Sequence, residues 1–151
     1  MKLMHCRKLI VKKGKEYHLL PMSEIVFFYI KNKLVFCVDA KGVRHLTEWS
    51  NLKTAHDQLD ERSFFTRSRN FIFNIDFIKS FRPIGFGKIS VELDLTPSIK
   101  LDISQNASVY FRSWIRKNAC LPENENSGDK YDYVNEIDES KKNSSSNFSL
   151  I

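Results

Sequence analysis

Cysteine is scarce in this sequence, and its three copies are far apart. They lie at Cys6, Cys37 and Cys120 in a chain of 151 residues. An odd number at such distances excludes a disulfide framework and lacks the close pairing of zinc ligands. We therefore expect these three side chains to be reduced and to serve in packing.

Long apolar runs are missing as well. The first residues form a short mixed stretch that leads to Lys12 and Lys13, without the apolar segment of a signal peptide. No later stretch approaches the roughly 18 apolar residues that a membrane span requires. The sequence therefore predicts a cytoplasmic protein that does not enter a membrane.

Residue combinations that support catalysis are also lacking. The four histidines show neither the HxxxH nor the HxH spacing of paired metal ligands. Gly85, Phe86 and Gly87 lack the remaining residues of a phosphate-binding loop, which favours a turn between strands. There is no GxSxG turn, and no cysteine lies in a known catalytic signature. We expect no enzyme, and neither a cofactor nor a metal.

Positive charge is what the sequence has in excess. Lys and Arg number 24 against 18 Asp and Glu, for a net charge of +6. Residues 121–151 hold seven acidic and three basic side chains, so residues 1–120 hold 21 basic and 11 acidic ones, a net charge of +10. A basic body attracts polyanions, most often nucleic acid. Charge alone fits a soluble basic protein equally well.

Short strands dominate the predicted structure of the first 120 residues. Residues 9–20 predict a hairpin around Gly14, and residues 25–30 and 34–38 predict two core strands joined by a polar tip. A turn at residues 39–42 precedes a strand at 43–46. After a helix, further strands are predicted at residues 71–73, 77–78, 88–93 and 99–103, with a break at residues 83–87.

Two short helices are expected among the strands. Ser50 is placed to cap the first helix, and Ser104 is placed to cap the second. The apolar stripe of the first helix consists of Leu52, Ala55, His56 and Leu59. The buried stripe of the second consists of Ala107, Tyr110, Phe111 and Trp114.

The composition changes at Leu121, where Pro, Asn, Asp, Glu, Ser and Lys become dominant. Such a segment does not bury enough apolar surface to order itself. We therefore predict one mainly β domain at residues 1–120 and a disordered, acidic, Ser- and Asn-rich tail at residues 121–151.

The segment from Phe64 to Asn74 carries a resemblance to a known family. A helix containing Leu52 leads to Phe64, then to a polar and basic loop, and then to an aromatic and aliphatic strand that ends at Asn74. This order resembles the signature of the LytTR family and extends over about residues 9–117. The matching positions are Leu52, Phe64, Arg69, Phe71, Ile72, Asn74 and Ile78.

The resemblance implies a compact, LytTR-like fold of small antiparallel sheets with one or two short helices. It also implies a transcriptional regulator, similar to response regulators, that binds double-stranded DNA sequence-specifically. Loops inserted into the major groove, and not a recognition helix, would make the contacts. The implied DNA-binding residues are Lys31, Asn32, Lys33, Arg67, Ser68, Arg69, Asn70, Ser104, Gln105 and Asn106.

The chemistry of these residues suits base recognition. Arg can pair with guanine O6 and N7, and Asn or Gln can pair with adenine N6 and N7. Arg67 and Arg69 alternate with polar residues, so strand geometry would place both on one face and favour a shared anionic partner. Backbone N–H groups at the start of the last helix can hold a phosphate. Asn74 is expected to make structural hydrogen bonds at a strand end.

Three departures from the family pattern leave alternatives open. Thr66, Ser68 and Gln105 stand where the family commonly has Arg, His and Arg. One alternative is a LytTR-like protein-interaction module that no longer reads bases. Another is single-stranded or RNA binding by stacking on the Phe residues around the loop.

Many family members join this domain to a receiver domain, for which the chain has no space before residue 9. We expect a stand-alone regulator, a partner of a separate sensor, or a fragment. A second copy on paired sites is implied by the resemblance alone. The opposed charges suggest that the tail competes with DNA for the basic body.

Overall fold

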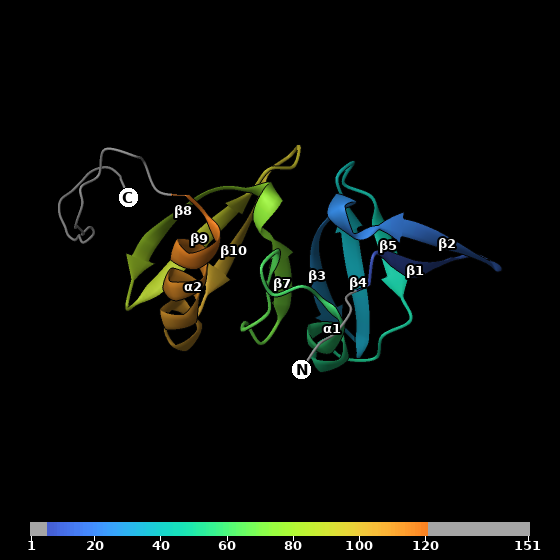
Figure 1. The fold of residues 1–151 in the computed structure, drawn as a ribbon, viewed down its shortest axis with the longest axis horizontal. Coiled ribbons are helices and arrows are strands. Elements are labelled where there is room, and N and C mark those ends of the chain that lie inside the picture. Colours follow the sequence, from blue (N-terminus) through green and yellow to red (C-terminus); the bar gives the residue numbers. More distant parts are fainter. Residues whose placement is uncertain (1–5, 121–151) are drawn as a thin grey trace.

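The computed structural model describes residues 6–120, which form two antiparallel sheets and two α-helices (Figure 1). One sheet has seven strands in the order β2-β1-β5-β4-β3-β7-β6, and the other has three in the order β10-β9-β8. The predicted class, mainly β with small antiparallel sheets and two short helices, is therefore confirmed. The predicted disorder of residues 121–151 lies outside the described residues.

The strands and helices have the following bounds. The seven-stranded sheet contains β1 (Lys8–Lys13), β2 (Glu16–Pro21), β3 (Ile25–Lys31), β4 (Leu34–Asp39), β5 (Arg44–Thr47), β6 (Phe64–Phe65) and β7 (Phe71–Asn74). The three-stranded sheet contains β8 (Ile78–Gly85), β9 (Lys88–Leu93) and β10 (Ile99–Ile103). The helices are α1 (Leu52–Gln58) and α2 (Gln105–Asn118), with 3-10 turns η1 (Met22–Glu24) and η2 (Ile75–Phe77).

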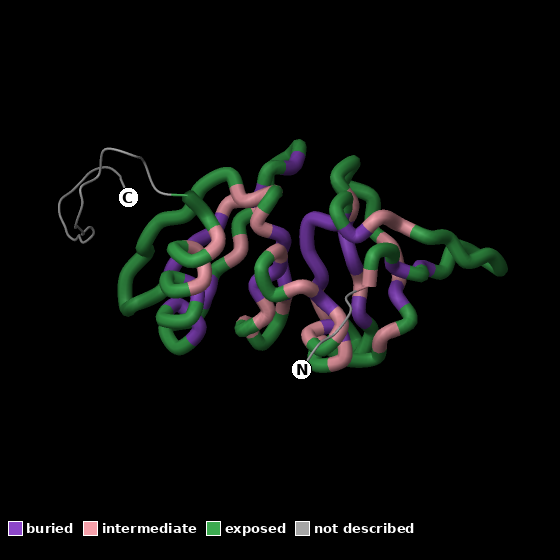
Figure 2. The backbone as a smooth tube through the Cα atoms, in the orientation of Figure 1, coloured by how far each residue is buried: buried purple, intermediate pink, exposed green. Residues whose placement is uncertain are grey.

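The seven-stranded sheet separates two apolar cores, because neighbouring residues of a strand face opposite sides. Phe28 and Ile72 face one side and pack with Ala55 and Leu59 of the α1 segment. Phe27 and Phe73 face the other side and pack with β9 and α2. Figure 2 shows the buried residues concentrated in the central strands of the molecule. The central strands β3 and β7 therefore contribute apolar residues to a core on each face of the sheet.

Most predicted elements form where the sequence places them. The hairpin around Gly14, the pair of core strands and the strands at residues 88–93 and 99–103 are all present. Ser104 caps α2, since its Oγ accepts a hydrogen bond from the Ala107 N–H at 3.2 Å. Asn74 makes the expected structural hydrogen bonds, donating from Nδ2 to the Ile25 carbonyl at 2.9 Å.

Four local predictions are wrong. Asn51, and not Ser50, caps α1, because its Oδ1 accepts a hydrogen bond from the Thr54 N–H at 2.8 Å. β8 continues through Pro83, so the break is confined to the turn at Phe86 and Gly87. Phe77 lies in the 3-10 turn η2. Tyr110 is 47% exposed instead of buried.

The cysteines are free, and only one fully serves the packing role expected of all three. Cys37 is buried in the core, and burial, with a smaller contribution from nearby Asp39, raises the pKa of its thiol to about 12. Cys6 is partly buried and donates a hydrogen bond from Sγ to Gln58 Oε1 at 3.1 Å. Cys120 is exposed. Within residues 6–120, no helix is long and apolar enough to cross a membrane.

Candidate nucleic-acid interface

The first predicted DNA-binding segment is the tight turn between β3 and β4. Asn32 and Lys33 both have positive φ, at 53° and 63°, and Lys31 pairs with Leu34 across the turn. This is the two-residue geometry whose twist matches that of the flanking strands. Lys31, Asn32 and Lys33 are all exposed. The turn therefore presents two lysines and an amide at the end of a rigid hairpin.

The second segment, residues 66–70, links β6 to β7 at the same end of the sheet. Tyr29 near the end of β3 pairs with Phe71 at the start of β7, so the β3–β4 turn and this loop emerge side by side. The segment is a loop and not a strand, so the predicted strand alternation of Arg67 and Arg69 is wrong. Both arginines and Asn70 are nevertheless exposed, and Ser68 is partly buried.

The start of α2 supplies the third segment. Ser104, Gln105 and Asn106 are exposed, and the Ser104 hydroxyl is used as the helix cap. The first N–H groups of a helix have no partner within the helix, so this end attracts anions. In Figure 1 the start of α2, the β6–β7 loop and the β3–β4 turn all lie toward the lower edge of the molecule.

A stacked pair connects the second and third segments. The Arg67 guanidinium carbon lies 3.9 Å from the centre of the Tyr110 ring, within the range of a cation–π interaction. A guanidinium that stacks on a ring keeps its N–H groups in the plane, where they remain available to an acceptor. Tyr110 thus fixes Arg67 without using its hydrogen-bonding capacity.

A surface hollow of about 420 Å³ lies between the β6–β7 loop and α1. It is lined by Leu52, Lys53, His56, Thr66, Arg67, Ser68 and Arg69. Three permanent cations meet at this hollow, so it suits an anion such as phosphate. Nδ1 of His56 lies 3.5 Å from Oδ1 of Asp57, and Nε2 lies 3.6 Å from Oε2 of Glu61. Two carboxylates therefore lie beside a residue that lines the hollow.

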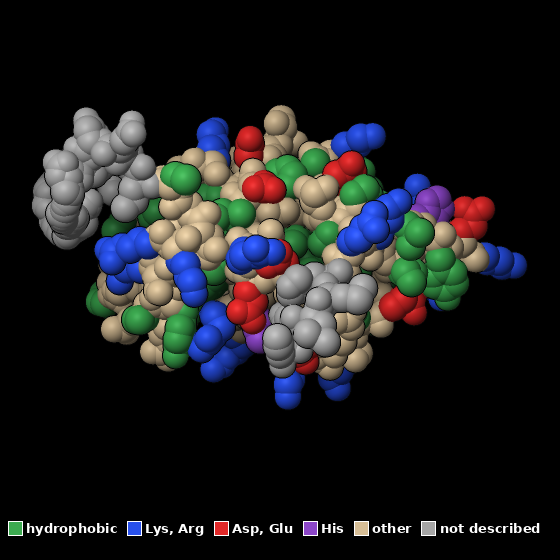
Figure 3. All heavy atoms as spheres, viewed as in Figure 1, with side chains coloured by type: hydrophobic (Ala, Val, Ile, Leu, Met, Phe, Trp, Pro, Cys, Tyr) green, Lys and Arg blue, Asp and Glu red, His purple; other side chains and the backbone are tan. Residues whose placement is uncertain are grey.

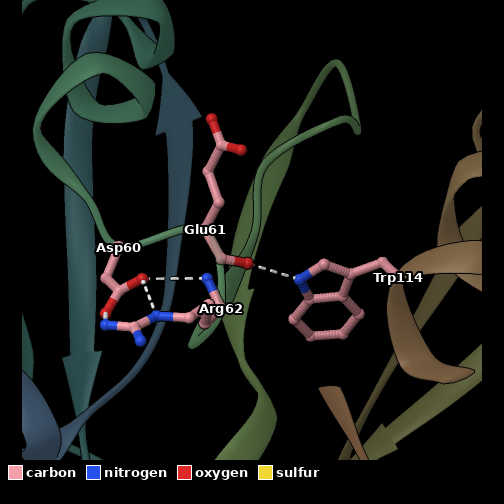
Figure 4. Close-up of polar contacts among 4 residues, drawn as sticks. All are labelled: Asp60, Glu61, Arg62 and Trp114. Carbon is pink, nitrogen blue, oxygen red and sulfur yellow. Dashed lines mark hydrogen bonds and ion pairs between the residues drawn. The ribbon is translucent and has the colours of Figure 1, made fainter. Parts of the chain in front are cut away.

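A second contact holds α2 against the segment that precedes β6. The indole Nε1 of Trp114 donates a hydrogen bond to the Glu61 carbonyl at 2.6 Å (Figure 4). Beside it, the Arg62 side chain binds both carboxylate oxygens of Asp60, with distances of 3.2 and 3.1 Å. The Trp114–Glu61 hydrogen bond and the Arg67–Tyr110 stack thus tie α2 to residues 60–67 at two points.

The sequence did not identify every residue of this region. Lys53 and His56 were not assigned to binding, although a spacing of three on a helix places them on one side. Tyr110 was assigned to the core, and Phe86 to a turn without a role. Figure 3 shows Lys and Arg side chains projecting from the lower edge, where the three predicted segments lie.

These features define a mainly β domain that presents basic and amide side chains from loops and a helix start at one end. The chain belongs to the LytTR family of DNA-binding domains, whose family model matches residues 15–116. A LytTr DNA-binding domain from a Bacillus cereus response regulator has a similar fold, with a TM-score of 0.66 and 21% identity. The match covers 74% of this chain and 98% of that one. No curated protein matches the sequence.

Membership of this family supports binding to double-stranded DNA and a general role in transcription regulation. LytTR is a family of DNA-binding domains and not of enzymes. Within residues 6–120, no three His, Cys, Asp or Glu side chains are grouped so that they could hold a metal ion.

Proposed function

We propose that this protein regulates transcription by reading a specific DNA sequence with loops inserted into the major groove. The observation that carries the proposal is the common position of the β3–β4 turn and the β6–β7 loop, set by the Tyr29–Phe71 strand pair. The exposed side chains of Arg67, Arg69 and Asn70 in the loop and of Asn32 in the turn lie at that end. On this proposal, Arg69, Asn70, Gln105 and Asn106 read bases, and Lys31 and Lys33 of the turn contact a neighbouring groove.

Phosphate binding is the second part of the proposal. Lys53 and the N–H edge of Arg67 hold a backbone phosphate in the hollow between α1 and the β6–β7 loop. The first N–H groups of α2 hold another. Such contacts fix the register of the protein on the duplex but carry no sequence information. A further partner of the proposed system is a separate sensor protein or a second copy of this chain on paired sites.

The protein-interaction and single-stranded alternatives are less well supported. Phe64, Phe65 and Phe73 are buried and Phe71 is partly buried, so the four rings around the loop offer little surface for stacking or docking. The surface beside them is lined by Lys53, Arg67 and Arg69. Tyr110 is the exposed ring beside this loop, and its face is covered by the Arg67 guanidinium. A cationic surface whose neighbouring rings are buried or covered favours a duplex partner.

A selection from randomised duplex DNA at near-physiological salt tests base reading directly. We expect an enriched motif with the wild-type protein and a loss of preference at one position with Arg69→Ala. One base contact of about 1–3 kcal/mol corresponds to about a 5- to 150-fold loss on the preferred site. Lys53→Ala should instead weaken binding to all sequences alike.

Lys117→Ala is the matched control, since Lys117 lies at the far end of α2, about 20 Å along the helix from its start. This variant should bind as the wild type does. If about five phosphates are contacted, the logarithm of affinity should fall against the logarithm of salt with a slope of about −4 to −5. If Arg69→Ala and Lys53→Ala changed the sequence preference and the affinity equally, the assigned roles would be contradicted. An affinity that does not change with salt concentration would contradict the phosphate contacts.

A further inference from the structure

We propose that the β8–β9 turn is a fourth DNA-contacting element, in which Phe86 packs against the methyl group of a thymine in the major groove. This inference rests on the proposed function and extends it to a segment outside the three predicted ones. The ligand chemistry is specific, because thymine is the base that presents a methyl group in that groove.

The exposure of Phe86 is the first observation. The side chain is 91% exposed, more than the other exposed large apolar side chains of residues 6–120. Single apolar side chains on a surface are ordinary, so the exposure of Phe86 has to be taken together with its backbone and its position. A phenyl ring that packs on almost nothing in the free protein is available to a partner.

The backbone of the turn is the second observation. Phe86 has a φ of 54°, in the left-handed region that bulky side chains rarely adopt. Gly85 and Gly87 on either side also have positive φ, at 104° and 75°. Three successive left-handed residues aim the ring outward from the end of the hairpin, and strain of this kind is concentrated at functional sites.

The position of the turn is the third observation. A Cβ atom on Gly87 would lie 2.7 Å from Cγ of Gln105, so the turn abuts the first residue of α2. The pairing of Ile89 with Ile103 fixes this arrangement, because it aligns the start of β9 with the end of β10. Figure 1 shows the turn between β8 and β9 on the same lower side as the start of α2. Phe86 thus stands beside a proposed reader of adenine.

The charge of the hairpin favours DNA over a protein partner. Residues 79–91 contain Lys79, Arg82 and Lys88 and no acidic residue. Phe81, at 41% exposure, and Ile84, at 37%, are the other exposed large apolar side chains of β8. One ring and parts of two further side chains fall far short of the roughly 800 Å² that each partner of a stable protein interface buries. A small apolar contact within a basic surface suits a base edge next to phosphates.

A double-mutant cycle on the selected DNA site tests the inference. Replacing a thymine by deoxyuridine removes only the methyl group, and Phe86→Ala removes only the ring. We expect each change to weaken binding about fourfold at one thymine next to the position read by Gln105, the effect of about one buried methyl group. The two changes together should weaken binding no further, and the salt dependence should stay constant.

Two further variants serve as controls. Phe86→Asn keeps a residue that tolerates positive φ, so it separates loss of the ring from a distorted turn. Tyr17→Ala removes an aromatic side chain of 60% exposure from the β1–β2 hairpin, and it should leave binding unchanged. Thermal melting checks that each variant is folded.

The outcomes separate this inference from the function on which it rests. Wild-type protein that binds no duplex would overturn both. Wild-type protein that binds while Phe86→Ala and Phe86→Asn bind equally well would overturn the fourth contact alone. A loss of affinity that is the same with thymine and deoxyuridine at every position would overturn the methyl contact. Unchanged DNA binding with reduced transcription in a purified system would assign Phe86 to a protein partner.

Discussion

Arg67 shows how a loop residue can be held ready for a ligand. A free arginine side chain loses rotamer entropy when it binds, and that loss weakens the interaction. With its guanidinium 3.9 Å from the Tyr110 ring centre, Arg67 has already lost part of this freedom. Tyr110 is therefore a positioning residue for the interface, because it acts through Arg67.

Replacing Tyr110 by alanine should lower DNA affinity about two- to fivefold, the equivalent of one exposed cation–π contact of about 0.5–1 kcal/mol. Tyr110→Phe keeps the ring face and should retain full affinity. Val109→Ala, at a neighbouring exposed position of α2, controls for loss of side-chain surface. Fluorescence anisotropy with the selected duplex provides the measurement. Tyr110→Phe binding as weakly as Tyr110→Ala would show that the hydroxyl matters and the ring does not.

Tyr110 also shows a limit of predicting burial from the spacing of apolar residues. Around the α2 axis, Tyr110 lies about 60° from Ala107 on one side, and Phe111 lies about 40° from it on the other. A spacing of three or four therefore fits both residues, although Phe111 is buried and Tyr110 is 47% exposed. The position of the stripe depends on what packs on it, which the spacing does not contain.

Asn74 links elements at the junction of the two sheets. Its side chain is 1% exposed, donates to the Ile25 carbonyl and accepts from the Asp76 N–H, both at 2.9 Å. It therefore joins the start of β3 to the turn η2 that leads into β8. Removing it leaves the buried Ile25 carbonyl unsatisfied, at a cost of about 1–3 kcal/mol, and takes from the N–H of exposed Asp76 a hydrogen bond of about 0.5–1.5 kcal/mol.

Asn74→Ala should therefore lower the free energy of unfolding by about 2–4 kcal/mol in urea denaturation. Asn70→Ala removes an exposed amide from the nearby β6–β7 loop and should change it by less than about 0.5 kcal/mol. When both variants are folded, Asn70→Ala should weaken DNA binding more than Asn74→Ala does, since only Asn70 is a proposed reader. A stability loss of the same size in both variants would contradict the structural role of Asn74.

The end of β8 shows why one element was shortened in the sequence prediction. Proline has no N–H to donate and is found in sheets mainly on edge strands. Pro83 therefore predicted a break, but β8 is the edge of the three-stranded sheet and Pro83 pairs with Ile89 there. The prediction lacked the strand order, which decides whether a missing donor matters. Likewise, Ser50 and Asn51 are both good caps, and only the observed hydrogen bond distinguishes them.

At the scale of the whole molecule, the order of strands was beyond the sequence pattern alone. Hairpins such as β1–β2 and β3–β4 follow from local turns. The pairs β1–β5 and β3–β7 join segments that are distant in the chain, and they place β1 inside the sheet and the β6–β7 loop beside the β3–β4 turn. The three DNA-binding segments were predicted from the family resemblance and not from periodicity, and their common end follows from these strand pairs.

The distribution of charge leads to the last prediction, which concerns residues 121–151. We propose that residues 1–120 form the DNA-binding domain and that the acidic tail competes with DNA for it, because the two segments carry net charges of +10 and −4. Deleting residues 123–151 should then raise affinity on the order of threefold at low salt and have no effect at high salt, where such attraction is screened.

A full-length variant with the seven tail carboxylates changed to amides is the matched control, since it keeps the length and removes the charge. It should bind as the truncated chain does, whereas affinity equal to that of the wild type would contradict competition by charge. The melting temperature tests the boundary separately. A truncated chain that melts at the wild-type temperature supports a domain that ends near residue 120, while a clear decrease would show that the tail contributes to the fold, because lost packing lowers the free energy of unfolding.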